Sequence, residues 1–163
     1  MRTLVVMRHG KSGYPEGVPD FERPLAERGR RQAALAGDWM REHLEPIDAV
    51  LCSAATRTRE TLAATGIEAP AEFLDDIYGA WPGALLEVLR TAPADAETVL
   101  MVGHAPGMPA LAETLAGESS DPALLREIRA GFPTSAVAVL QTATAWSQIN
   151  PGDATLVDYV VAR

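Results

Sequence analysis

Leu4-Val5-Val6-Met7-Arg8-His9-Gly10, close to the start of the chain, joins an apolar run to two basic side chains and a glycine. The apolar run has the length of a strand and no alternation of apolar and polar residues, which is typical of a parallel strand covered on both faces. The pattern recurs at Val99-Leu100-Met101-Val102-Gly103-His104, where a second apolar run ends in a glycine and a histidine. The sequence thus predicts two histidines at the points where buried strands end.

Further short apolar runs alternate with helix-period segments along the rest of the chain. Strands are expected at Thr3–Met7, Ala49–Leu51, Thr98–Val102, Ser135–Leu140 and Leu156–Val161. Helices are expected at Glu27–Leu44, Arg57–Thr65, Pro82–Arg90, Pro106–Ala116 and Pro122–Ala130. This alternation is typical of an α/β protein with a largely parallel sheet. The charged end of the last run predicts an edge strand.

The composition indicates a small acidic chain with one domain. Its 163 residues suit a single domain over 1–163, and its net charge of −8 argues against nucleic acid or an anionic membrane as the main partner. The single cysteine, Cys52, excludes an internal disulfide. No apolar run has the length of a membrane span, and the short apolar start predicts a strand rather than a signal peptide. The expected location is the cytoplasm.

Four residues are expected to meet at one edge of the sheet. Arg8, His9 and His104 follow predicted strands directly, and Arg57 begins the helix that follows another strand. The carboxyl ends of parallel strands lie at the same edge, where open α/β sheets bind their ligands. The irregular segment Gly13–Pro24 is expected to form a loop over this edge.

This set of side chains suits the transfer of a phosphoryl group. Two guanidinium groups can neutralise a dianionic phosphoryl group and stabilise its oxygens as charge redistributes. A neutral imidazole is a competent nucleophile toward phosphorus, and neighbouring arginines lower its pKa. The second histidine can donate a hydrogen bond from the opposite side of the group.

Motifs along nearly the whole chain resemble those of the histidine phosphatase superfamily. Arg8-His9-Gly10 is similar to its hallmark tripeptide after the first strand. The other matching segments, in chain order, are Asp20-Phe21-Glu22-Arg23-Pro24-Leu25, Ser53-Ala54-Ala55-Thr56-Arg57-Thr58-Arg59-Glu60-Thr61, Val102-Gly103-His104-Ala105-Pro106-Gly107 and Phe132-Pro133-Thr134-Ser135-Ala136. The short chain and its Arg-Pro-Leu segment are most similar to the small bacterial phosphohistidine phosphatases of the SixA type.

The resemblance implies a fold, a mechanism and a ligand set. The implied fold is a three-layer αβα sandwich of the phosphoglycerate mutase-like kind. His9 is implied as the nucleophile, with Arg8, Arg57 and His104 as phosphate ligands and with no cofactor or metal. The implied substrate is a phosphohistidine on a protein, with a small phosphorylated metabolite as the alternative.

The sequence leaves two possible roles open for each of two further residues, Asp76 and Arg23. Relatives that cleave phosphate esters use a carboxylic acid to protonate the leaving oxygen, and Asp76 is the closest match to that position. Asp76 is equally well explained as a solvated loop carboxylate, and a phosphohistidine substrate needs such an acid less. Arg23 either reaches the substrate phosphate from the loop or pairs with Glu22 or Asp20.

Other functional classes are less well supported by the residues. A metal site with His9, His104 and Asp76 as ligands is disfavoured because neighbouring arginines repel a divalent cation. Mutases of the superfamily are usually longer, and the phytase branch adds a helical domain. A non-catalytic phosphoprotein-binding module is the rival from another class, but binding alone does not require a nucleophile.

Overall fold

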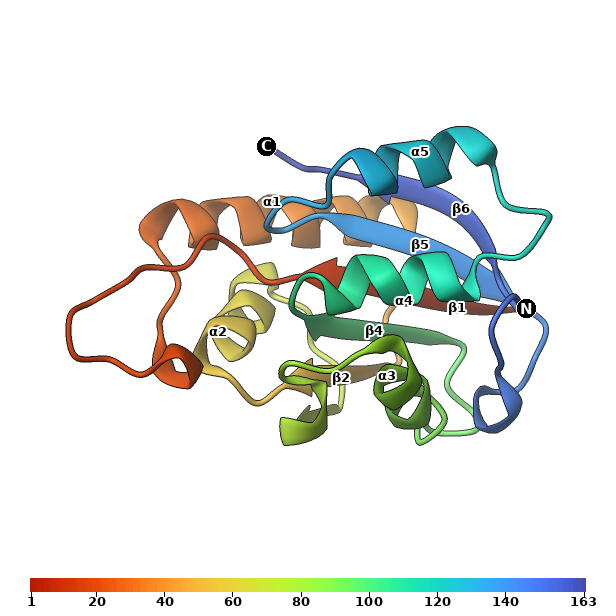
Figure 1. The fold of residues 1–163 in the computed structure, drawn as a ribbon, viewed down its shortest axis with the longest axis horizontal. Coiled ribbons are helices and arrows are strands. Elements are labelled where there is room, and N and C mark those ends of the chain that lie inside the picture. Colours follow the sequence, from red (N-terminus) through yellow and green to blue (C-terminus); the bar gives the residue numbers. More distant parts are fainter.

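The computed structural model describes residues 1–163 and contains one six-stranded sheet between two sets of helices (Figure 1). The strands are β1 (Arg2–Arg8), β2 (Ala49–Ser53), β3 (Ala71–Leu74), β4 (Thr98–Gly103), β5 (Val137–Thr142) and β6 (Thr155–Val160). The α-helices are α1 (Glu27–His43), α2 (Thr56–Thr65), α3 (Pro82–Leu89), α4 (Gly107–Leu115) and α5 (Pro122–Ala130). Short 3-10 turns form η1 (Asp20–Glu22), η2 (Asp75–Ile77) and η3 (Trp146–Gln148). None of the helices combines the length and apolar character needed to cross a membrane.

The unbroken apolar strands have one buried cluster on each side. In β1, Leu4 and Val6 belong to the cluster that includes α3, α4 and α5, while Val5 and Met7 belong to the cluster that includes α1 and α2. Successive side chains of a strand point to opposite faces, so a strand between two helical layers needs apolar residues at every position. The structure confirms the three-layer αβα sandwich.

The sheet has the strand order β3-β2-β4-β1-β5-β6. The pairs β3·β2, β2·β4 and β4·β1 are parallel, and β5 is antiparallel to both of its neighbours. The sheet is therefore largely parallel and β6 lies at its edge, as predicted. Because β5 runs the other way, it starts at the edge where β1, β2 and β4 end, and the segment before it reaches the same place.

Two strand assignments differ from the prediction. The edge strand β3 has no apolar run, and Glu72 and Phe73 within it are exposed, so its sequence shows no strand pattern. The fifth strand begins at Val137 rather than at Ser135. Ser135 has a φ of 65°, a left-handed conformation that interrupts an extended strand before it can start there.

Candidate active site

The carboxyl ends of β1 and β4 place the two histidines side by side. Arg8 pairs with Gly103 across the two strands, and the backbone N–H of His9 donates to the Gly103 carbonyl at 2.9 Å. The ring centroids of His9 and His104 are 5.3 Å apart. The register of a parallel pair thus brings together two residues that are far apart in the sequence.

His9 is held as a neutral imidazole with one free nitrogen. Its ring is only 7% exposed, and Nδ1 lies 2.7 Å from the Gly10 carbonyl oxygen. A carbonyl oxygen only accepts, so Nδ1 carries the proton and Nε2 keeps its lone pair. Burial lowers the pKa of His9 to about 4, and the charges of Arg57 and Arg8 act in the same direction. At neutral pH, Nε2 is therefore an unprotonated nucleophile.

Gly10 is required by the close approach of two backbone segments. A Cβ at Gly10 would lie 2.8 Å from the carbonyl oxygen of Gly29 in α1. A Cβ at Gly29 would lie 2.2 Å from the carbonyl oxygen of Lys11. Only glycine on both sides lets the turn after His9 pack against the first turn of α1. This contact explains the glycine of Arg8-His9-Gly10 in physical terms.

Arg8 and Arg57 are each fixed by one backbone carbonyl. Arg8 Nη1 donates to Phe132 O at 3.0 Å, from the segment before β5, and Arg57 Nη1 donates to Asp20 O at 2.6 Å. Burial lowers the pKa of Arg8, but an arginine remains charged at neutral pH. The structure thus holds two cations at the edge where the histidines lie.

Three nitrogen atoms of this group are buried without a hydrogen-bond partner: Arg8 Nε, Arg57 Nε and His104 Nδ1. An unsatisfied buried donor costs about 1–3 kcal/mol, and more when it is charged. A group with several acceptor oxygens can remove this cost at the two arginine Nε atoms. The donor set therefore fits an oxyanion such as a phosphoryl group.

Asp20, which the sequence suggested only as a partner of Arg23, holds Arg57 in place. Its carboxylate accepts from Arg57 Nη2 at 3.0 Å, from Arg23 Nε at 3.0 Å and from the Tyr78 hydroxyl. The Tyr78 hydrogen bond, with those of Arg23 and Arg57, holds the pKa of Asp20 well below its usual range. This carboxylate is therefore charged at neutral pH.

Arg23 forms an ion pair with Asp20, one of the two partners that the sequence suggested for it. Besides Asp20, it donates to Ser12 Oγ at 2.7 Å and to the Gly13 carbonyl at 3.0 Å, so it braces the loop after β1. Its charge also contributes to the lowered pKa of His9. A contact of Arg23 with substrate stays a prediction.

Asp76 lies away from the other predicted residues. It is exposed and lines a separate surface hollow with Leu74 and the α3 residues Ala84, Glu87 and Val88. The side chain of this segment that does reach the histidines is Tyr78, whose ring meets that of His104 edge-on at 5.3 Å. A role for Asp76 as the acid that protonates a leaving group stays a prediction, and its exposed position in η2 does not favour it.

We expect Asp76→Asn to change the hydrolysis rate of either phosphate esters or phosphoramidates by less than about twofold, since surface substitutions are usually near neutral. Steady-state kinetics with one substrate of each kind measure the effect. A selective loss of ester hydrolysis would instead show that Asp76 reaches the leaving group.

Ser53 is a site residue that the sequence reasoning did not single out. It ends β2, is fully buried, and its Oγ lies 2.8 Å from Nε2 of His104. Its place as the first residue of the motif that leads into the arginine-bearing helix was the available signal. The hydroxyl thus joins the strand that leads to Arg57 with the histidine that follows β4.

The site opens on two sides. A hollow of about 60 Å³ beside His104 is bordered by Trp81, which is 69% exposed, and by Pro106. On the other side, Arg8 borders a shallow groove of about 590 Å³ that runs between α4 and α5 past Phe132. A substrate larger than its phosphoryl group has room on either side.

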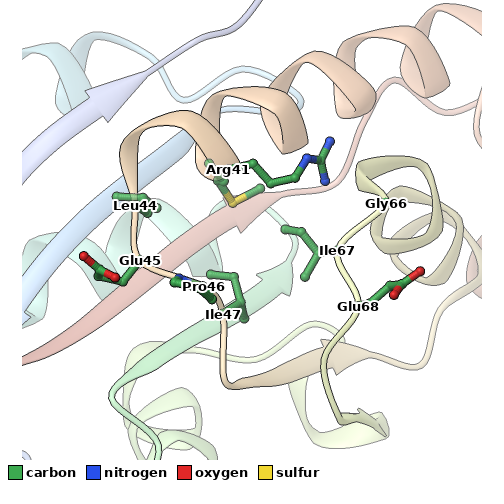
Figure 2. A pocket seen from close by; sticks show the side chains of 9 residues that line it. Arg41, Leu44, Glu45, Pro46, Ile47, Gly66, Ile67 and Glu68 are labelled. Atoms are coloured by element: carbon green, nitrogen blue, oxygen red, sulfur yellow. The ribbon is translucent and has the colours of Figure 1, made fainter.

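A separate cavity of about 370 Å³ lies at the opposite edge of the sheet, between the ends of α1 and α2 (Figure 2). Figure 2 shows Ile47 and Ile67 facing one another across it. Its one arginine, Arg41, already donates to Asp38 and to the Thr65 carbonyl. The cavity has no group suited to phosphoryl chemistry.

The fold and the site together define an α/β protein with a neutral histidine nucleophile among arginines arranged for a phosphoryl group. Residues 4–98 match the model of the histidine phosphatase superfamily (branch 1). The chain belongs to this superfamily.

Relatives and solved structures agree with this assignment. The uncharacterized protein Rv1276c of Mycobacterium tuberculosis is 50% identical over 158 residues, which cover 96% of this chain and 100% of the relative. The uncharacterized protein ML1117 of Mycobacterium leprae is 40% identical, with the same coverage of both chains. The structure of the putative phosphohistidine phosphatase SixA from Nakamurella multipartitia superposes with a TM-score of 0.91 at 42% identity, over 99% of this chain and 96% of that one. SixA complexed with tungstate shares the fold at 24% identity, with a TM-score of 0.77, covering 98% of this chain and 96% of the other.

Proposed function

We propose that this protein is a metal-independent phosphatase that acts on phosphohistidine in proteins through a covalent phosphohistidine on His9. Nε2 of His9 attacks phosphorus, and the new N–P bond forms as the bond to the substrate's imidazole nitrogen breaks. The substrate imidazole leaves with a proton taken up from water. Water then attacks the phosphorylated His9, and inorganic phosphate leaves as His9 returns to its neutral form.

Arg8, Arg57 and His104 act on the phosphoryl group in this mechanism. The arginine Nε atoms are donors without a partner, and Nδ1 of His104 is a third buried nitrogen without one, so phosphoryl oxygens can accept from this group. Preorganised donors of this kind stabilise the charge that builds up on the transferring group. The positive charge of the arginines also supports a reaction without a divalent metal, which they would repel.

The charged state of Asp20 is the observation that favours phosphohistidine over an alkyl phosphate ester. An alkoxide leaving group needs a proton donor, but Asp20 is held as a carboxylate by Tyr78, Arg23 and Arg57. Its hydrogen bond to Asp20 also raises the pKa of Tyr78. An imidazole leaving group takes its proton from water, so it needs no acid from the protein. The similarity to a structure named as a SixA phosphohistidine phosphatase supports the same choice.

The shallow groove beside Arg8 supports a protein substrate. It is continuous with the site and is bordered by small or apolar side chains such as Pro109, Ala110 and Phe132. A buried metabolite pocket normally encloses most of its ligand. A phosphorylated side chain on a protein needs instead an open surface next to the cation pair.

The test compares three substrates at equal concentration with a chelator present: a phosphohistidine peptide, phosphoserine and p-nitrophenyl phosphate. We expect kcat/KM for phosphohistidine to exceed that for phosphoserine by about 100-fold or more, the usual contribution of an acid catalyst. p-Nitrophenyl phosphate should be hydrolysed measurably, because its phenolate leaves without a proton. Faster hydrolysis of phosphoserine would favour a metabolite phosphatase, binding without turnover would favour a phosphoprotein-binding module, and loss of activity with chelator would contradict the metal-independent mechanism.

A further inference from the structure

We propose that Ser53 is a positioning residue that fixes His104 in the tautomer with its proton on Nδ1, aimed at the phosphoryl group. The inference deepens the proposed function, since it assigns a role to a residue behind the phosphate-binding histidine. It rests on the hydrogen-bond partners of the Ser53 hydroxyl and of the two ring nitrogens of His104.

The Ser53 hydroxyl has two partners. The backbone N–H of Ala55, at the start of α2, donates to Oγ at 3.3 Å, and Nε2 of His104 lies 2.8 Å from the same oxygen. A serine hydroxyl has one proton to donate. The amide of Ala55 can only donate, so Nε2 of His104 is the one partner that can receive this proton.

The opposite tautomer leaves one more buried group unsatisfied, because Nδ1 has no protein partner in either tautomer. If Nε2 of His104 carried the proton, the Ser53 hydroxyl would accept twice and its own proton would have no acceptor, in a residue with no exposed surface. Nδ1 would then present a lone pair, without a partner, toward an anion. Each unsatisfied buried group costs about 1–3 kcal/mol, so the hydrogen bonds select the tautomer with the proton on Nδ1.

The surroundings of His104 keep this arrangement in place. The ring is 9% exposed, and Tyr78 packs edge-on against it. Burial lowers the pKa of His104 to about 3, with the charges around His9 and Arg57 as further causes, so the ring is neutral near pH 7. A protonated imidazole donates from both ring nitrogens, but a neutral imidazole donates from only one. Which nitrogen of His104 carries the proton therefore matters. Ser53 thus decides whether the phosphoryl group meets a donor or a lone pair.

The first measurement is the tautomer itself, by long-range ¹H–¹⁵N spectra of ¹⁵N-histidine-labelled protein near pH 7. In the unmodified chain we expect a pyrrole-type shift for Nδ1 of His104 and a pyridine-type shift for Nε2. Ser53→Ala should shift His104 toward a mixture of the two tautomers. A pyridine-type Nδ1 in the unmodified protein overturns the proposal outright, whether or not any variant folds.

The second measurement is the affinity for inorganic phosphate, determined by calorimetry, which does not depend on turnover. Ser53→Ala should weaken binding about two- to fivefold, because only the fraction of His104 with its proton on Nδ1 then donates to the anion. Ser53→Thr keeps the hydroxyl and should restore both the tautomer and most of the affinity. Ser120→Ala is the matched control, because Ser120 is also buried but its Oγ accepts from the Leu156 amide, outside the site.

The outcomes distinguish an effect of Ser53 on the tautomer of His104 from a loss of protein stability. They also distinguish failure of this proposal from failure of the proposed phosphatase function. Unchanged phosphate affinity and an unchanged tautomer in a folded Ser53→Ala protein contradict the proposal. Equal losses in Ser53→Ala and Ser120→Ala also contradict it, because they indicate a stability effect. If phosphate binding and the tautomer behave as expected while phosphohistidine is not hydrolysed, the proposed function fails and the role of Ser53 stands.

Discussion

Replacing His9 with alanine is expected to abolish phosphohistidine hydrolysis, with a loss of about 10³-fold or more in kcat. The reason is that Nε2 of His9 is the nitrogen with a free lone pair beside the unpartnered donors of Arg8 and Arg57. Release of inorganic phosphate measures the rate. Acid quenching with ³²P-labelled substrate should trap an acid-labile, base-stable phosphoryl group on the unmodified protein and none on His9→Ala.

His43→Ala is the matched control for His9→Ala. His43 ends α1, where its ring stacks on Trp39 away from the site. This variant should retain both the rate and the trapped phosphoryl group. A label that persists in His9→Ala, or equal rates for His9→Ala and the unmodified chain, would show that another residue is the nucleophile.

Replacing Arg57 with alanine is expected to lower kcat/KM about 10²–10³-fold, the usual cost of removing one preorganised donor to a developing charge. Arg57 is 6% exposed, and its Nε is one of the unpartnered donors, while both Nη atoms bind Asp20. The substitution therefore removes a phosphoryl ligand and also leaves the Asp20 carboxylate less fully paired. Steady-state kinetics on phosphohistidine and calorimetry with inorganic phosphate measure the two effects.

The same helix provides the control for Arg57→Ala. Arg59, two residues later in α2, lies over the Phe73 ring and donates to the Ala54 carbonyl instead of facing the histidines. Arg59→Ala should keep phosphate affinity and rate within about twofold of the unmodified protein. Similar losses in both variants would mean that helix stability, rather than the guanidinium of Arg57, accounts for the effect.

The position of the cations matters more than the overall charge. The chain has a net charge of −8, yet Arg8, Arg57 and Arg23 all contribute to lowering the pKa of His9. Coulombic effects fall off within about 10 Å at moderate ionic strength, so the nearest groups set the charge of the site. One phosphoryl group can bind locally on a surface that repels bulk polyanions.

Much of the site could be predicted from the sequence because it depends on local rules. Arg8, His9 and His104 follow short apolar runs that are typical of buried strands, and the carboxyl ends of parallel strands lie at one edge. Arg57 starts the helix after the third such strand. The family motifs coincide with these positions, so the physical pattern and the resemblance indicate the same residues.

Only the tertiary structure shows which side chains contact and orient these site residues. Asp20 and Arg57 are 37 positions apart, and their pairing depends on how the loop after β1 folds over the sheet. The ring of Tyr78, the residue that follows η2, meets that of His104, whereas Asp76 within η2 lines a separate hollow. Ser53 and His104 meet because β2 and β4 are neighbours in the sheet. Strand periodicity identifies the residues at a sheet edge, whereas hydrogen bonds between loops depend on the packing of the whole chain.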